Sequence, residues 1–133
     1  MNFSVTDLKC IEMKIQLLTK AEEQVMQYLW KIGKGFLKDI LDEFPEPKPH
    51  TNTVSTILKL LKEKKFVEYN ISGRQHEYFP LISKEQYSKK SISSLVKNYF
   101  LGSYTNAVSF LVENDELTVE DLEALLNELK NKD

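Results

Sequence analysis

The sequence predicts a mostly α-helical protein with one small β-hairpin, and three observations support this prediction. Residues 18–64 hold three successive segments with helical periodicity, of which the third is apolar on one face and polar or basic on the other. Two strand-like segments follow directly, around Ser72-Gly73-Arg74. Residues 83–133 then hold three more amphipathic helical segments. Three helices followed by a hairpin is the order of a winged helix-turn-helix domain, here followed by a helical domain.

The first helix of the N-terminal domain has clear start and stop signals. Thr19 and Glu22 form the pattern of a capping box, and Leu18 supplies the apolar residue that precedes it. Gly33 and Gly35 end the helix. The residues expected on its buried face recur at helical spacing: Ala21, Val25, Leu29 and Ile32.

The second helix is short and is predicted from Phe36 to Phe44. Its inward residues are expected to be Leu37, Ile40, Leu41 and Phe44. Three prolines, Pro45, Pro47 and Pro49, end it and form a stiff connection to the next helix.

The third helix is predicted from about Thr51 to Lys64 and carries two distinct faces. Its expected buried stripe consists of Val54, Ile57, Leu58 and Leu61. A second face repeats the same spacing with small polar or cationic side chains only, namely Asn52, Ser55, Thr56 and Lys59. Such a face is either an ordinary solvated surface or one that enters a DNA major groove. The hairpin that follows the helix favours the second interpretation.

The hairpin and the charges around it agree with a nucleic-acid partner. Strands are predicted at residues 66–71 and 75–79, and Gly73 supplies the positive φ that the turn between them requires. Arg74, at the tip, is placed to contact a phosphate. The whole chain has a formal net charge of −2, but residues 48–76 hold six basic and two acidic side chains. Local charge decides phosphate contact, although an ordinary lysine-rich solvated face would look similar.

The C-terminal helices are expected to bury their apolar stripes in a self-complementary dimer. Ser83 caps the first of them, Gly102-Ser103 breaks it, and Thr118 caps the last. The stripes contain Ile92, Leu95, Val96, Tyr99, Tyr104, Val108, Leu111, Leu122, Leu125, Leu126 and Leu129. Three such helices bury little surface alone, so dimerisation is the main hypothesis and packing onto the first domain is the alternative.

The composition excludes several classes of protein. Cys10 is the only cysteine among 133 residues, so an internal disulfide or a cysteine-based metal site is not expected. His50 and His76 lack the neighbours of a metal site, and neither a cofactor motif nor a catalytic constellation is present, so no enzyme is predicted. With no signal peptide and no apolar run of membrane-spanning length, a cytoplasmic location is expected. Residues 1–17 are interpreted as an N-terminal extension, poorly ordered over about residues 1–12.

Over residues 16–130 the chain resembles the penicillinase repressor (BlaI/MecI) family of bacterial transcriptional regulators. The resemblance starts with residues 18–22, Val25-Met26 and Leu29-Trp30. It continues in Thr53-Val54-x-Thr56-x-Leu58-x-x-Leu61 and Lys64-Lys65-Phe66-Val67, and then in Gly73-Arg74-x-x-x-Tyr78-x-Pro80-Leu81 and Ser83-x-Glu85-x-Tyr87. Each piece is weak alone, but their order and spacing together are specific.

The resemblance implies a homodimeric repressor, with a winged helix at residues 18–82 and a dimerisation domain at residues 83–133. It implies a double-stranded DNA operator with two inverted half-sites of TACA/TGTA type. It also implies release of the operator after a membrane-embedded sensor protease cuts the dimerisation domain. The corresponding bond lies near Phe110-Leu111, where well-known members of the family have Asn-Phe. The family's usual glycine before the first wing strand is Lys65 here, and the cysteine cluster of the copper-responsive branch is missing.

The main hypothesis is therefore a repressor that places the third helix in the major groove. Its expected base-edge and phosphate contacts are Thr51, Asn52, Thr53, Ser55, Thr56 and Lys59, with Lys62, Arg74 and Lys48 on the phosphate backbone. The alternative is a winged helix that binds another protein and no specific DNA. The low net charge and the uncharged Asn52 and Ser55 favour that alternative.

Overall fold

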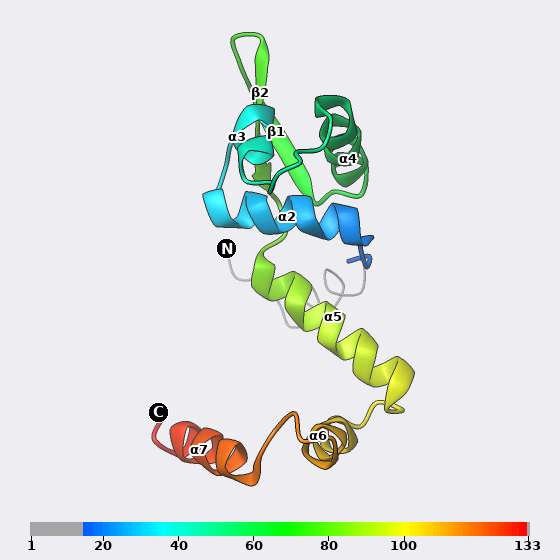
Figure 1. Ribbon diagram of the computed structural model, residues 1–133, viewed down its shortest axis with the longest axis vertical. Helices are drawn as coiled ribbons and strands as arrows, with labels where there is room; N and C mark the ends of the chain where they lie inside the picture. The colour runs from blue at the N-terminus through cyan, green and yellow to red at the C-terminus, as the bar shows by residue number, and fades with distance from the viewer. Residues whose placement is uncertain (1–14, 133) are drawn as a thin grey trace, which may run out of the picture. The chain divides into compact units, whose positions relative to one another are not determined.

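A computed structural model describes residues 15–132, and it confirms the predicted fold class. The expectations for residues 1–12, and for Cys10, lie outside the described residues. The elements are α2 (Lys20–Ile32), α3 (Leu37–Asp42), α4 (Thr51–Glu63), β1 (Val67–Ser72), β2 (Gln75–Pro80), α5 (Lys84–Tyr99), α6 (Tyr104–Glu113) and α7 (Val119–Lys130), labelled in Figure 1. The chain divides into two compact units, residues 1–90 and 91–133, so the division falls within α5.

Helix α2 begins as the sequence predicted. The Glu22 amide donates to Thr19 Oγ1 over 3.2 Å, and the Thr19 amide donates to Glu22 Oε1 over 2.9 Å, which completes the capping box. The helix ends at Gly33, whose φ is 85°. Its buried face differs from the predicted stripe in one place, because Ala21 is exposed while Met26 is fully buried. Because the consecutive residues Val25 and Met26 are both buried, the buried face of α2 covers a wider arc of the helix than the predicted stripe.

Helix α3 and the proline connection turn the chain into α4. Ile40 and Phe44 are buried, and Leu37 and Leu41 are half-buried, as predicted. Lys48 closes the end of α3, because its ammonium donates to the carbonyl oxygens of Leu41, Asp42 and Phe44 over 3.3, 3.1 and 2.9 Å. A lysine in this position stabilises the free carbonyls at a helix C-terminus.

The hairpin pairs β1 with β2 in an antiparallel register that runs from Val67 opposite Pro80 to Ser72 opposite Gln75. A third segment joins this sheet at Gly35, which exchanges two backbone hydrogen bonds of 2.9 and 2.8 Å with Tyr78. A side chain at position 35 would collide with Ile32, since a Cβ built there lies 2.7 Å from Ile32 Cδ1. Figure 1 shows the hairpin projecting past α3 and α4.

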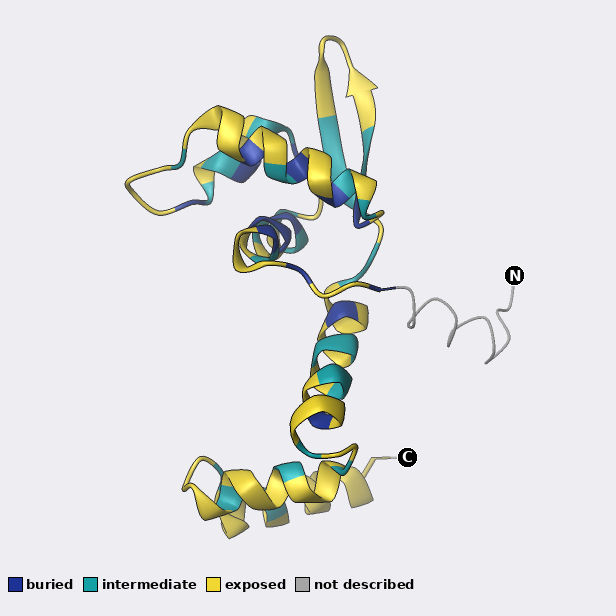
Figure 2. Cartoon of the chain, turned by 90° about the vertical axis from the view of Figure 1, so that its right-hand side faces the viewer, coloured by how far each residue is buried: buried dark blue, intermediate teal, exposed yellow. Residues whose placement is uncertain are grey.

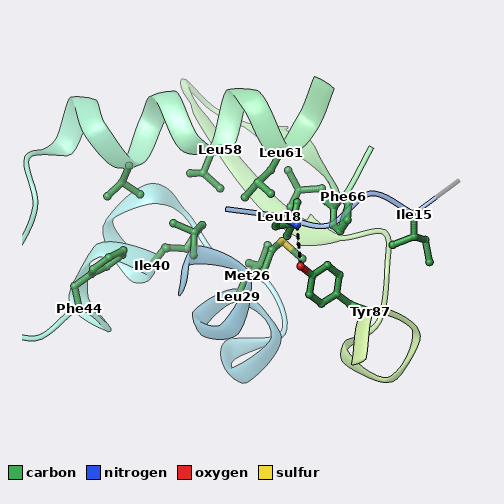
Figure 3. Packing of buried hydrophobic residues seen from close by; sticks show 13 residues of the cluster. Ile15, Leu18, Met26, Leu29, Ile40, Phe44, Leu58, Leu61, Phe66 and Tyr87 are labelled. Carbon is green, nitrogen blue, oxygen red and sulfur yellow. Dashed lines mark hydrogen bonds between the residues drawn. The ribbon is translucent and has the colours of Figure 1, made fainter. Parts of the chain in front are cut away.

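The core of the first unit joins its helices and β1, and Tyr78 of β2 packs against it (Figure 3). It contains Ile15, Leu18, Val25, Met26, Leu29, Ile40, Phe44, Val54, Leu58, Leu61, Phe66, Val67 and Tyr87. Tyr87, from the first turns of α5, accepts a hydrogen bond from the Leu18 amide and donates one to Glu23 Oε1, both over 2.8 Å. These bonds tie the start of α5 to the start of α2, so Tyr87 belongs structurally to the winged-helix unit.

The end of α4 is a Schellman motif with a lysine where glycine is usual. The Phe66 amide donates to Leu61 O over 2.9 Å, and the Lys65 amide donates to Lys62 O over 3.0 Å. Lys65 lies between them with φ of 65°, in the left-handed region that disfavours residues with a Cβ. At the position where the resemblance leads one to expect glycine, the backbone therefore carries the steric cost that glycine would avoid.

Replacing this lysine by glycine should stabilise the protein. Lys65→Gly is expected to raise the free energy of unfolding by about 1 kcal/mol, because glycine adopts positive φ without the steric cost of a Cβ. Chemical denaturation at a fixed protein concentration measures the difference. Glu63→Gly, two residues earlier and inside the helix, is the matched control and should destabilise by about 1 kcal/mol. Equal destabilisation by both glycines would contradict the idea that Lys65 is strained.

The second unit contains the end of α5, together with α6 and α7. Helix α7 begins at the predicted cap, Thr118, whereas α6 is capped by Ser103, which was predicted only as part of a helix break. Ser103 Oγ accepts from the Asn106 amide over 3.1 Å, and Thr118 Oγ1 accepts from the Asp121 amide over 3.0 Å. Neither α6 nor α7 has a buried residue. Ten of the eleven predicted dimerisation residues are exposed or half-buried, whereas Val96 is buried with 3% of its surface exposed.

Candidate nucleic-acid interface

Helix α4 separates its two faces as the sequence predicted. Val54, Leu58 and Leu61 are fully buried, and Ile57 is half-buried. The other face remains exposed along its whole length at Asn52, Ser55, Thr56 and Lys59, together with Thr51 and Thr53 in the first turn. In Figure 2 the buried residues of α4 lie on one side of the helix and the exposed ones on the other.

The first turn of α4 is capped by a histidine. His50 Nδ1 accepts a hydrogen bond from the Asn52 amide over 3.1 Å. Thr56 directs its hydroxyl back to Asn52 O over 2.9 Å. Asn52 and Ser55 are exposed on this face of α4, while the opposite face of the helix packs on the core. From the sequence, His50 was considered only as a metal ligand and rejected, because its capping role depends on backbone geometry that composition does not reveal.

Some basic side chains near α4 already bind other groups of the protein, and others are exposed without an ion-pair partner among residues 15–132. Lys62 forms an ion pair of 3.5 Å with Glu68 and lies 5.3 Å from the centroid of the Tyr69 ring. Lys48 is held by the carbonyls at the end of α3. Lys59 and Arg74 are exposed, and within residues 15–132 neither forms an ion pair. Among the predicted phosphate contacts, these two are the most accessible to a ligand.

Lys64 has a structural role at the opposite end of α4. Its ammonium donates to both carboxylate oxygens of Glu22 over 2.8 Å, and only 4% of the Glu22 side chain is exposed. Burial alone would raise the pKa of Glu22, but the hydrogen bonds from Lys64 and Thr19 outweigh it and hold this pKa below its usual value. The pair joins α2 to α4, and so Lys64 fixes the orientation of α4 within the unit.

A groove of about 490 Å³ lies between α3, α4 and the hairpin. Its lining consists of Phe36, Leu37, Lys38, Leu41, Thr51, Ser55, Arg74, Gln75, His76 and Tyr78. The lining contains two permanent cations and no acidic residue. Two of the predicted contacts on α4, Thr51 and Ser55, thereby share one surface with Arg74 of the hairpin.

The hairpin face that borders this groove is aromatic. Tyr69 stacks on His76, with ring centroids 3.9 Å apart and an interplanar angle of 4°, and it meets Tyr78 edge-on at 5.6 Å. Burial, together with the nearby Tyr69, raises the pKa of Tyr78 above its usual value, so its hydroxyl stays protonated near neutral pH. The sequence analysis did not identify Tyr69, His76 or Lys38 as site residues. Tyr69 and His76 belong to one hairpin, but only its cross-strand register shows that their rings meet, and Lys38 reaches the groove from α3 through the tertiary fold.

The described residues contain neither a cluster of potential metal ligands nor a helix that could span a membrane. Within residues 15–132 no group of three or more His, Cys, Asp or Glu side chains is placed to hold a metal ion. No helix in the same range has the length and apolar character needed to cross a bilayer.

Comparison with known proteins identifies the family. A family model described as "Penicillinase repressor" matches residues 18–131. The chain belongs to the penicillinase repressor family. It is 27% identical over 123 residues to the penicillinase repressor of Bacillus licheniformis, covering 90% of this chain and 96% of that relative. It is 22% identical over 116 residues to the methicillin resistance regulatory protein MecI of Staphylococcus aureus strain N315, covering 86% of this chain and 94% of that relative. The MecI protein of Mammaliicoccus sciuri matches over the same shares at 22% identity.

Membership in the penicillinase repressor family confirms the resemblance drawn from the motifs, and the family match, at residues 18–131, extends through the winged helix and the C-terminal helices. The chain is a transcriptional repressor of the BlaI/MecI type, which is not an enzyme family. The individual DNA contacts, the dimer surface and the cleavage site remain predictions.

Proposed function

We propose that the protein is a homodimeric repressor that binds an inverted-repeat DNA operator and blocks transcription from it in the cytoplasm. Each protomer would place α4 in a major groove, and the dimer two-fold axis would align the two helices with successive half-sites. The observation that carries the proposal is the exposed polar face of α4 beside a groove without acidic side chains.

The chemistry of the α4 face suits base-edge recognition. Asn52 can hydrogen-bond to the N6 and N7 edge of adenine, and Lys59 can donate to the O6 and N7 acceptors of guanine. Thr51 and Thr53 lie in the first turn, where backbone amides favour a phosphate. Arg74 at the hairpin turn and Lys62 at the other end of α4 would contact the backbone on either side.

Dimerisation would be carried by the C-terminal helices. Leu125, Leu126 and Leu129 are 50%, 50% and 55% exposed on α7, which is a large apolar area for a helix in contact with water. Occupancy of a two-site operator depends steeply on dimer concentration, so weakening the dimer would release the DNA.

Proteolysis of the C-terminal helices is one way in which the dimer could be weakened and the DNA released. Phe110 and Leu111 lie within α6 and are 50% and 41% exposed. Their bond is part of a hydrogen-bonded helix, so cleavage there would require local unwinding of α6.

The test is fluorescence anisotropy of the purified protein on the DNA upstream of its own gene and on scrambled DNA, over a salt series. Selective binding with a steep salt slope supports the repressor. Weak, equal binding to both DNAs, together with a co-purifying protein, would instead favour the protein-interaction module.

Lys59 should be the most informative single position on α4. Lys59→Ala is expected to weaken operator binding by about 1–2 kcal/mol, because it removes a base-edge donor. Arg74→Ala should reduce the salt slope by about 0.9, the value for one phosphate contact. Lys20→Ala, which removes the same charge from an exposed position on α2, is the control and should leave both quantities unchanged. Unchanged binding in both the Lys59 and the Arg74 variants would contradict this docking.

A further inference from the structure

The ring of His76 is held in one orientation on the hairpin. It lies parallel to Tyr69 at a centroid distance of 3.9 Å, and Tyr78 meets it edge-on at 6.2 Å. Tyr69 is itself covered by the ammonium of Lys62, 5.3 Å from its centroid. One face of the imidazole is therefore occupied, while His76 as a whole remains exposed.

The charged groups around His76 are all basic on the side of the groove. His76 lines the groove together with Arg74 on the hairpin, Lys38 on α3, and the hydroxyls of Thr51 and Ser55 on α4. The phenol groups of Tyr69 and Tyr78 are titratable neighbours, the Lys62–Glu68 ion pair lies next to Tyr69, and no carboxylate lines the groove. Without a carboxylate partner, a positive charge on His76 has no counter-ion in the groove of the free protein. A groove that gathers cations and hydroxyls over an apolar floor is complementary to a row of phosphates.

We propose that this groove holds the sugar–phosphate backbone of one DNA strand and that His76 is a DNA-binding residue, which contacts a phosphate as the imidazolium. The inference rests on the proposed function and adds a contact to it. Protonated imidazole has two N–H donors, and a charge-assisted bond to a phosphate oxygen is about twice as strong as a neutral one. Tyr69 is the positioning residue, since its ring face fixes the imidazole plane and attracts its positive charge.

This contact makes DNA binding depend on pH. A phosphate favours the protonated form of His76, so bound DNA increases proton uptake, and affinity rises as pH falls through the titration range of histidine. The other histidine near the interface, His50, accepts the Asn52 amide at the start of α4. Substituting it by a residue that keeps this cap leaves His76 as the only imidazole at the interface.

The experiment measures operator affinity by anisotropy at pH 5.5 and pH 8.0 over a salt series, on the DNA upstream of the gene and on scrambled DNA. For the protein carrying His50→Asn, which keeps a good N-cap acceptor, the salt slope should be steeper at pH 5.5 by up to about 0.9. Adding His76→Ala should abolish this difference between the two pH values. Tyr69→Leu should reduce it, whereas Tyr69→Phe, which keeps the ring, should retain it.

Asn70→Ala, an uncharged change on the opposite side of the hairpin, is the control and should behave as the parent protein. Thermal unfolding of each variant confirms that the fold is intact. Selective binding with a pH-dependent slope that survives His76→Ala overturns the inference while the repressor function stands. An absence of selective binding at both pH values overturns the proposed function and this inference together.

Discussion

Phe66→Ala should lower the free energy of unfolding by about 3–5 kcal/mol, the range for truncating a buried aromatic side chain. Phe66 is fully buried, and its ring meets Tyr87 edge-on at 5.7 Å. Its amide donates to Leu61 O over 2.9 Å, and its carbonyl accepts from the Leu81 amide over 2.8 Å. One residue thus joins the end of α4, the hairpin and the start of α5, and a cavity at this point is bordered by all three.

Two variants separate the cavity from other effects of the substitution. Phe66→Leu keeps most of the apolar volume and should cost about 1–1.5 kcal/mol. Ile71→Ala removes an apolar side chain from the hairpin where 72% of it is exposed, and should change stability by less than about 0.5 kcal/mol. Denaturant unfolding at one protein concentration measures all three. A loss for Phe66→Ala no larger than that for Ile71→Ala would show that the junction is not part of the cooperative core.

The local elements could be predicted from the sequence because their signals are local. Capping boxes need only residues three positions apart, and the one at Thr19 and Glu22 forms as predicted, as does the Ser83 cap, where Ser83 Oγ accepts from the Gln86 amide over 3.0 Å. The positive φ of Lys65 lies at the position where the resemblance pointed to a glycine. Spacing along one helix likewise identified the buried and exposed faces of α4.

What could not be predicted depends on how the chain folds back on itself, and not on spacing along one helix. Lys48 is basic and was predicted as a phosphate contact, but its ammonium donates to the carbonyl oxygens at the end of α3. Lys64 counted toward the basic patch, yet it neutralises buried Glu22 on a helix 42 residues away in sequence. His76 becomes a candidate contact only once the register brings Tyr69 beneath it. The net charge counted along the sequence is therefore larger than the charge available to bind DNA, because some of the basic side chains bind other groups of the protein.

The second large effect is expected at the proposed dimer surface, from Leu126→Asp. The Leu126 side chain is 50% exposed on α7, on the same helical face as Leu122, Leu125 and Leu129. A carboxylate in an apolar interface loses its hydration without gaining a partner, which should shift the protein to monomer in sedimentation equilibrium. Because one winged helix then binds each half-site alone, operator affinity should fall by about 10²–10⁴-fold.

Asn127→Asp is the control, because it adds the same charge to the next residue of α7, outside the apolar stripe. It distinguishes disruption of the dimer interface from destabilisation of the helix. It should remain dimeric and bind the operator as the parent protein does, with unchanged helicity in both variants by circular dichroism. The monomeric variant should keep the same salt slope per half-site, because the phosphate contacts of the winged helix are not altered. If Leu126→Asp stayed dimeric, the apolar face of α7 would have another role, and the dimer would have to form through α5 and α6.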